Sequence, residues 1–281
     1  MGDLQQKGKM RIAGRMRVSG FGVSLLIFLI VTLIARSLIP SLIFSGASLL
    51  CTYVAWIWIE RINFGKIQAK ADFSVIKKLA KSTLPLAISG ILFAYLYNAQ
   101  KYYLGFIGSD EDVAIVTILM LPAMLLNIFF GFFFKGAELT RMAEIYTSGQ
   151  PEKFYRRITH SLMFIGISFV FFIIGIYFLG LLILSWLYGI DLSEYRLQLI
   201  LLSLGGVFLA LYSLFGAVLI VLRLQNILLL CMASVAAVSG TLMWWLVSSY
   251  GLYGAALSNL VIFGPLSILY CCAYYLWKKR R

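Results

Sequence analysis

A lysine and two amides near the end of one long apolar segment are the side chains most able to do chemistry. Asn98, Gln100 and Lys101 lie at the end of the run Ser82–Gln100, which continues past the lysine to about Phe106. A lysine can pair with an anionic group, and amides can hydrogen-bond hydroxyls. Because a charge in a membrane is costly, one interpretation is a polar cavity. The alternative is that Lys101 extends to the outer surface.

Lys101 shares a predicted helical face with small residues. Gly90, Ala94, Asn98 and Gly105 recur with it at intervals of three to four residues, which places all five on one side of a helix. Lipid is a poor neighbour for a face that combines small residues, an amide and a charge. The pattern therefore favours a face directed at a cavity or at other protein.

Two prolines and one asparagine within apolar runs are further candidates. Pro85 and Pro122 lack an amide hydrogen and are candidate kinks. Transporters use bent helices near their binding sites, although a kink can also have no role. Asn127 either contacts a substrate or joins neighbouring helices by a hydrogen bond.

Residues for catalysis or metal binding do not gather into a motif. His160, the single histidine, is placed at the end of an apolar run, and no acid or nucleophile is predicted beside it. The four cysteines show no metal-ligand spacing, and a phosphate-binding glycine loop is absent. An integral-membrane acyl- or glycosyltransferase would want acidic or His/Asp pairs at a membrane face. The sequence therefore predicts no enzyme, no metal and no cofactor.

The composition indicates a membrane protein. Of 281 residues, 62% are hydrophobic and 12% are charged, and so little polar surface cannot cover a water-soluble globule. The net charge of +13 could suggest nucleic acid. We exclude that partner because the charges cluster in short loops between apolar runs, which fits anionic lipid headgroups.

Long runs without charged residues predict about eight membrane-spanning helices in an all-α, polytopic bundle. About 20 apolar residues are needed to cross the bilayer. The last run has no charge over 54 residues, and the turn-forming segment Ser248–Gly254 divides it in two. The runs are Val18–Ala35, Ser37–Ile59, Ser82–Phe106, Val113–Phe134, Ser161–Ile190, Leu197–Leu222 and Leu224–Trp277.

The basic residues predict the orientation. All lysines and arginines except Arg36, Lys101 and Arg196 would lie on one side, which is the cytoplasmic side by the positive-inside rule. Both termini are therefore placed in the cytoplasm, with the chain as a multi-pass protein of the cell membrane. Loop lengths predict two helices over 1–59, a cytoplasmic linker over 60–81 and six helices over 82–281.

Five short motifs resemble those of a known transporter family in order and spacing. They are Leu79–Gly90, Asn98–Gly105, Leu187–Gly189, Leu222–Asn226 and Tyr250–Ala256. Together they resemble polysaccharide flippases of the O-antigen, capsule or teichoic type. That family belongs to the multidrug/oligosaccharidyl-lipid/polysaccharide exporter superfamily, which has the MATE-like fold of two six-helix lobes.

The resemblance implies a function and partners. It implies that the chain flips a polyprenyl-pyrophosphate-linked oligosaccharide across the bilayer by alternating access, for surface polysaccharide biosynthesis. Lys101 is then the first candidate for the anion contact and Arg223 the second. Asn98, Gln100 and Asn127 would hydrogen-bond sugar hydroxyls. Polysaccharide polymerase or export proteins, or a missing N-terminal lobe, are the implied protein partners.

The chain departs from the family pattern in two ways, and these keep alternatives open. Gln100 stands where the family often has an aspartate, so ion coupling is in doubt. Residues 72–277 resemble one whole C-terminal lobe and 1–59 the last two helices of the other, so four helices are expected to be missing. The alternatives are a truncated or partner-dependent half transporter, and a drug/cation antiporter, which the basic cavity disfavours. The sugar, coupling ion and oligomeric state are left open.

Overall fold

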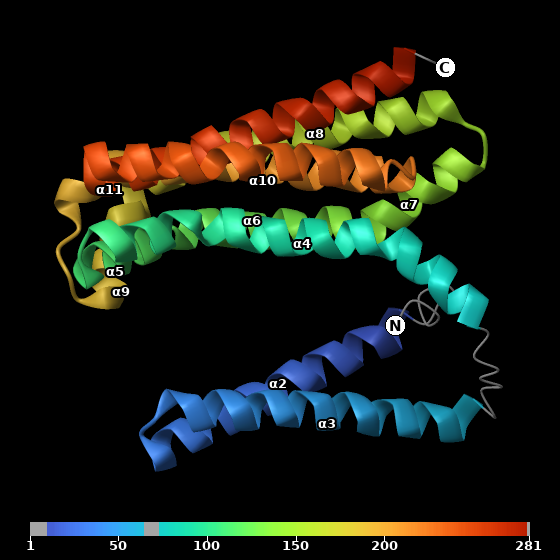
Figure 1. Cartoon of the computed structure of the whole chain (residues 1–281), viewed down its shortest axis with the longest axis horizontal. Coiled ribbons are helices and arrows are strands. Elements are labelled where there is room, and N and C mark those ends of the chain that lie inside the picture. The colour runs from blue at the N-terminus through green and yellow to red at the C-terminus, as the bar shows by residue number, and fades with distance from the viewer. Residues whose placement is uncertain (1–9, 65–72, 280–281) are drawn as a thin grey trace. The chain divides into compact units, whose positions relative to one another are not determined.

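The apolar runs of the sequence form long helices, and every regular element of the described residues is helical. The structure is a computed structural model that describes residues 10–64 and 73–279. It divides into two compact units, Met1–Phe73 and Ser74–Arg281, called here the first and second units. Figure 1 shows the path of the chain through both.

The first unit is a pair of helices, α2 (Met10–Ala35) and α3 (Leu38–Phe64). The two pack along each other, and polar side chains join them at two levels. The indole nitrogen of Trp56 donates to the Ser19 hydroxyl at 2.8 Å, and the Ser24 hydroxyl donates to the Ser45 carbonyl at 2.9 Å. Such hydrogen bonds are typical of helices that associate in lipid.

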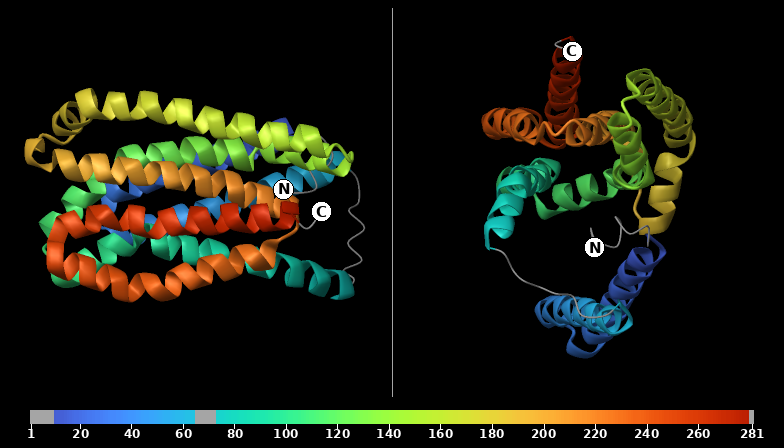
Figure 2. Two further views of the ribbon diagram at one scale, coloured as in Figure 1. Left: turned by 90° about the horizontal axis from the view of Figure 1, so that it is seen from above. Right: turned by 90° about the vertical axis from the view of Figure 1, so that its right-hand side faces the viewer.

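The second unit contains the remaining helices, which run roughly parallel or antiparallel to one another (Figure 2). They are α4 (Phe73–Ile107), α5 (Asp110–Leu119), α6 (Leu121–Lys135), α7 (Ala137–Thr147), α8 (Pro151–Gly175), α9 (Leu181–Tyr188), α10 (Arg196–Val221) and α11 (Gln225–Lys279). A π-helical turn, η1 (Ile176–Gly180), joins α8 to α9, and a 3-10 turn, η2 (Ser193–Tyr195), precedes α10.

Helix α10 is the centre of the second unit. It packs against α6, α8 and α11, and most of its residues from Leu199 to Leu219 are buried. Close approach depends on a glycine pair. A Cβ added to Gly205 would lie 2.6 Å from the Cβ of Asn259, and one added to Gly206 would lie 3.3 Å from Leu126. These glycines bring the backbone of α10 against α11 and α6, as small residues do in membrane helix pairs.

Helix α11 is two helices joined by a sharp turn, as Figure 1 shows. Gly251 has φ 53° and ψ −129°, a conformation that glycine adopts far more readily than other residues. Gly254 then packs so tightly that a Cβ would overlap the Leu246 carbonyl oxygen. The turn lies within the segment where the sequence predicts it. We call the two parts, Gln225–Tyr250 and Leu252–Lys279, the first and second arms of the α11 hairpin.

The helices have the length and composition that a membrane requires. Among the described residues, six helical stretches are long and apolar enough to cross it, with the α11 hairpin counted as one. They are Val18–Ala35, Ile39–Trp56, Leu121–Thr147, Pro151–Tyr188, Ser193–Val221 and Gln225–Lys279. Helix α4, with 35 residues, is long enough but is not among the six. The all-α polytopic bundle predicted from sequence is confirmed.

Helix ends differ from the predicted spans at two loops. The acidic loop after α4 is shorter than expected, because Asp110 already begins α5 and Ser109 forms a capping box with Asp112. The predicted linker 60–81 is also partly helical, since α3 continues to Phe64 and α4 begins at Phe73. Residues 65–72 of that linker lie outside the described part.

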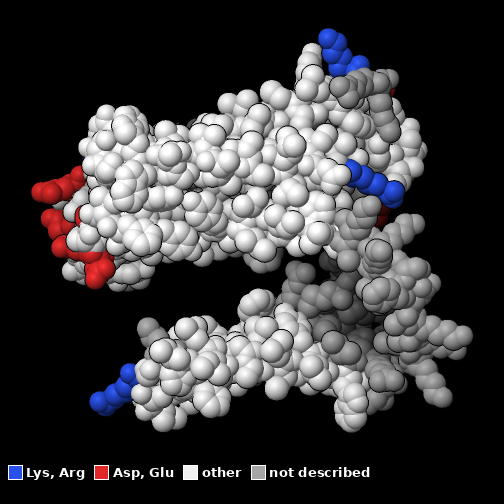
Figure 3. Space-filling view, in the orientation of Figure 1, with Lys and Arg blue, Asp and Glu red and all other residues white. Residues whose placement is uncertain are grey.

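Charges segregate to opposite ends of the second unit. Figure 3 shows acidic residues at the end formed by α5 and α9, and basic residues at the end where the chain terminates. Asp110, Asp112 and Asp191 belong to the first end, while Arg223 and Lys278 belong to the second. This separation is the one expected for a helical bundle whose middle lies in hydrocarbon.

Candidate functional site

Helix α4 carries two polar surfaces that point in different directions. Adjacent residues in a helix are rotated by about 100°, and this rotation separates Gln100 from Lys101. The Gln100 side chain is fully buried. Lys101 and Asn98 are half-buried, and Gly90, Ala94 and Gly105 on their face are exposed. The expectation that Gln100 shares a cavity with Asn98 and Lys101 is therefore not met in this structure.

Gln100 lies in a buried cluster between three helices. Its amide nitrogen donates to the Tyr97 carbonyl at 3.2 Å and to the Met120 sulfur at 2.7 Å. Its amide oxygen accepts from the Ser258 hydroxyl at 3.3 Å. The glutamine thus links α4 to the junction of α5 and α6 and to the second arm of α11. This arrangement suits packing within the bundle rather than contact with a large substrate.

The uncovered face of α4 is formed by Gly90, Ala94, Asn98, Lys101 and Gly105, and we call it the α4 polar face. A Cβ added to Gly90 would have no neighbour within 4 Å. The Asn98 amide nitrogen donates to the Ala94 carbonyl of its own helix at 2.9 Å, which leaves the amide oxygen directed away from that bond. No other helix of the second unit therefore packs closely over Gly90.

Lys101 brings an uncompensated positive charge to the α4 polar face. The ion pair formed among residues 10–64 and 73–279 joins Glu138 of α7 to Arg157 of α8, and Lys101 has no acidic partner in that part of the chain. A lone ammonium group beside apolar surface attracts anions. Phosphate and pyrophosphate groups are suitable ligands because each presents several acceptor oxygens to the lysine's three donors.

The remaining predicted residues do not join Lys101. Arg223 is exposed in the turn between α10 and α11, with φ 59°, at the basic end of the unit. Lys101 lies near the acidic end, so the two cations are separated by most of the length of α10, 26 residues or about 39 Å. Asn127 is half-buried on α6.

The two prolines occupy different positions in their helices. Pro85 is inside α4, where the Ser89 hydroxyl donates to its carbonyl at 2.7 Å. Pro122 is buried in the first turn of α6, directly after the break at Met120 that separates α5 from α6. Pro122 therefore begins a helix, a position in which its missing amide hydrogen costs little.

Sequence reasoning missed the polar pair Ser258–Asn259 in the second arm of α11. Both residues are fully buried. The Asn259 amide nitrogen and oxygen have no hydrogen-bond partner among the described residues, although buried amides are usually paired. An asparagine in an otherwise apolar run was the available signal. It lies against Gly205 of α10, so it marks the tightest crossing of the bundle.

Comparisons with models of protein families, with curated proteins and with solved structures found no match to this chain. The fold and the charge separation define a polytopic helical membrane protein. Its further function rests on the site residues and on the motifs in the sequence.

Proposed function

We propose that this chain translocates a lipid-linked oligosaccharide across the cell membrane for surface polysaccharide biosynthesis, with both termini in the cytoplasm. The observation that carries the proposal is Lys101. It is a lysine without an acidic partner in the described residues, on the α4 polar face that its own unit leaves uncovered.

A charge on such a face has a strong preference for its surroundings. Contact with lipid tails would cost about 3 kcal/mol or more, so the face suits a water-filled cleft or a protein surface. A positive charge then selects anionic ligands and disfavours cationic drugs. The pyrophosphate of a polyprenyl-linked oligosaccharide fits Lys101, and the amide oxygen of Asn98 can accept hydrogen bonds from sugar hydroxyls.

The mechanism we propose is alternating access between two helical lobes. The α4 polar face would lie in the cleft between them, open first to the cytoplasmic side and then to the outer side. Gly90, Ala94 and Gly105 keep this face smooth enough for a bulky headgroup. The motif resemblance to polysaccharide flippases supports this mechanism independently of the geometry.

A second candidate is a half transporter that depends on a partner lobe. The uncovered α4 polar face favours it, because a face of this kind needs a protein or an aqueous cleft beside it. The DNA immediately upstream decides between the two candidates. Four further hydrophobic helices encoded there, in frame or shifted, would support the half transporter.

The role of Lys101 is tested by complementing a deletion strain. Lys101→Ala should lower surface polysaccharide roughly tenfold, since it removes a charge-assisted contact. Lys101→Arg should retain it. Arg141→Ala, which removes an exposed charge from α7, is the matched control and should behave as the unmodified chain. Full complementation by Lys101→Ala, at equal protein level in the membrane, would refute the assignment.

A further inference from the structure

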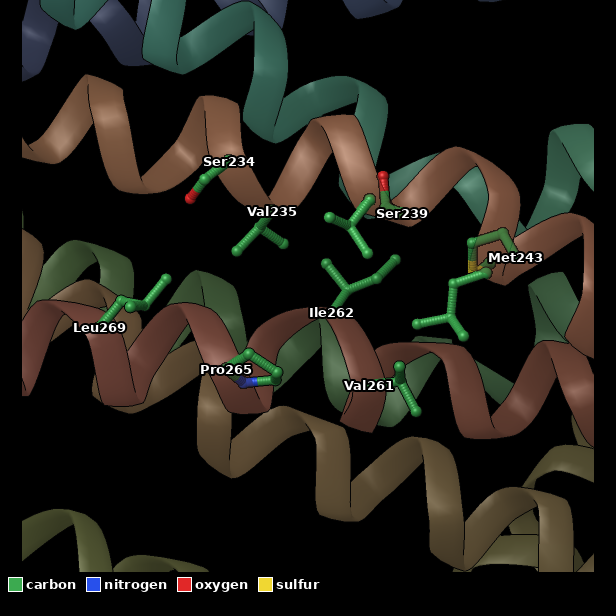
Figure 4. Close-up of a pocket in the computed structure, with 10 residues that line it drawn as sticks. Ser234, Val235, Ser239, Met243, Val261, Ile262, Pro265 and Leu269 are labelled. Atoms are coloured by element: carbon green, nitrogen blue, oxygen red, sulfur yellow. The ribbon is translucent and has the colours of Figure 1, made fainter.

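The α11 hairpin encloses an apolar groove between its arms. A cavity of about 320 Å³ is lined by Val235, Ser239 and Met243 of the first arm and by Val261, Pro265 and Leu269 of the second. Figure 4 shows these side chains between the two helices. The volume falls within the range of small-molecule binding sites.

The groove has no spare polar group to offer from its two serines. The Ser234 hydroxyl donates to the Cys231 carbonyl at 2.9 Å, and the Ser239 hydroxyl donates to the Ala236 carbonyl at 2.8 Å. In Figure 4 the Ser239 oxygen points away from the facing arm. A polar ligand would therefore lose hydrogen bonds to water without replacement, whereas a hydrocarbon chain would lose none.

A second apolar cavity continues the groove towards the ends of the arms. It has a volume of about 270 Å³ and is lined by Leu224, Ile227, Ala273, Leu276 and Trp277. The two cavities share faces of the hairpin. On the second arm, Val261, Pro265, Leu269, Ala273 and Leu276 recur every three to four residues, so they form one stripe along the helix.

The first arm contributes a matching stripe. Ile227, Ser234, Val238 and Leu242 are separated by seven, four and four residues, which also keeps them on one side of a helix. The two stripes together make an apolar trough, called here the α11 trough. From Val261 to Trp277 it extends about 24 Å along the helix axis.

The length of the α11 trough selects among membrane lipids. The hydrocarbon core is about 30 Å thick, so an ordinary phospholipid chain, confined to one leaflet, covers about 15 Å. A trough of about 24 Å passes the bilayer midplane. A single chain must be longer than a phospholipid tail to follow it, as a polyprenyl chain is.

Positive charges flank the end of the trough. Arg223 directly precedes Leu224, and Lys278 directly follows Trp277; both cations are exposed. The Lys278 ammonium lies 4.2 Å from the centre of the Tyr155 ring, which holds it near the helix ends. An anionic headgroup at this position would have its hydrocarbon chain directed into the trough.

We propose that the α11 trough binds the polyprenyl chain of one anionic carrier lipid, with its phosphate beside Arg223 and Lys278. This inference rests on the proposed function and adds a second contact region to it. Lys101 contacts the headgroup during translocation, whereas the trough holds the chain. Separate sites allow the headgroup to cross while the tail stays in hydrocarbon.

The test is photolabelling of the full chain in nanodiscs of phosphatidylcholine and phosphatidylglycerol. The probe is a polyprenyl phosphate with a diazirine in its hydrocarbon chain. Label should map to residues 225–279, and excess unlabelled polyprenyl phosphate should remove it. Equal competition by phosphatidylglycerol, or label confined to other helices, would refute the proposal.

Two matched pairs of variants locate the binding. Ser234→Phe fills the trough and should lower labelling roughly tenfold, whereas Ala237→Phe, exposed on another face of the same arm, should not. Arg223→Gln should lower labelling roughly fivefold, and Arg141→Gln should leave it unchanged. The arginine pair keeps the test decisive if Ser234→Phe does not fold. Equal labelling of both members of each pair would overturn the assignment.

This assay separates the trough from the proposed function. A chain that supports surface polysaccharide without labelling the hairpin contradicts the trough alone. A chain that labels the hairpin but leaves surface polysaccharide independent of its gene contradicts the proposed function alone.

Discussion

Gln100 and Lys101 are neighbours in sequence with opposite environments. The glutamine is completely buried and hydrogen-bonded to Met120 and Ser258, whereas the lysine lies on a face that other helices leave open. We assign the glutamine to packing and the lysine to binding. This division is the main revision that the structure makes to the predicted site.

Replacing Gln100 tests this division. Gln100→Ala leaves the Ser258 hydroxyl without one partner and opens space in the core, so the free energy of unfolding should fall by about 1–2 kcal/mol. Asn98→Ala is the control, because its amide bonds only to its own helix among the contacts described. Thermal unfolding of both proteins in the same detergent measures the difference, and equal stability would contradict the assignment.

The sequence predicted which residues of α4 are polar but not which of them are covered. A helical face follows from spacing, and Gly90, Ala94, Asn98, Lys101 and Gly105 were grouped correctly on one side. Whether a neighbouring helix covers a face depends on packing between distant segments. Gln100 meets Ser258 across 158 residues, and no local pattern reports such a contact.

At the scale of elements, the crossing of α10 with the α11 hairpin organises the second unit. Gly205 allows Asn259 to approach the α10 backbone, and both residues are buried. The turn of the hairpin was predictable because glycines and serines interrupt an apolar run. The crossing was not, since a glycine in a membrane helix does not reveal which partner it faces.

A methyl group at this crossing should destabilise the bundle. The Cβ of Gly205→Ala would lie 2.6 Å from the Asn259 Cβ, so backbones must move apart. The expected loss in the free energy of unfolding is about 1–3 kcal/mol. Gly166→Ala in α8, with nothing within 4 Å of the new Cβ, should be neutral. Unfolding curves in one detergent compare the two, and the assignment fails if both variants match the unmodified chain.

At the scale of the whole molecule, the apolar helices and the separated charges follow from composition and charge placement. Both were predictable because the bilayer constrains length and polarity more strongly than local propensity does. The role of the α11 trough was not predictable, since it needs two arms to be aligned in space. Lys101 and the trough together give the account its substrate, an anionic lipid with a long chain.

The most direct test of the account is the balance between precursor and product in cells. Deleting the gene should raise the pool of lipid-linked oligosaccharide, measured by mass spectrometry of extracted lipids, while surface polysaccharide falls. Restoring the unmodified gene should return both to their starting levels. A deletion that leaves the precursor pool and the surface polysaccharide unchanged would contradict translocation of a lipid-linked oligosaccharide by this protein.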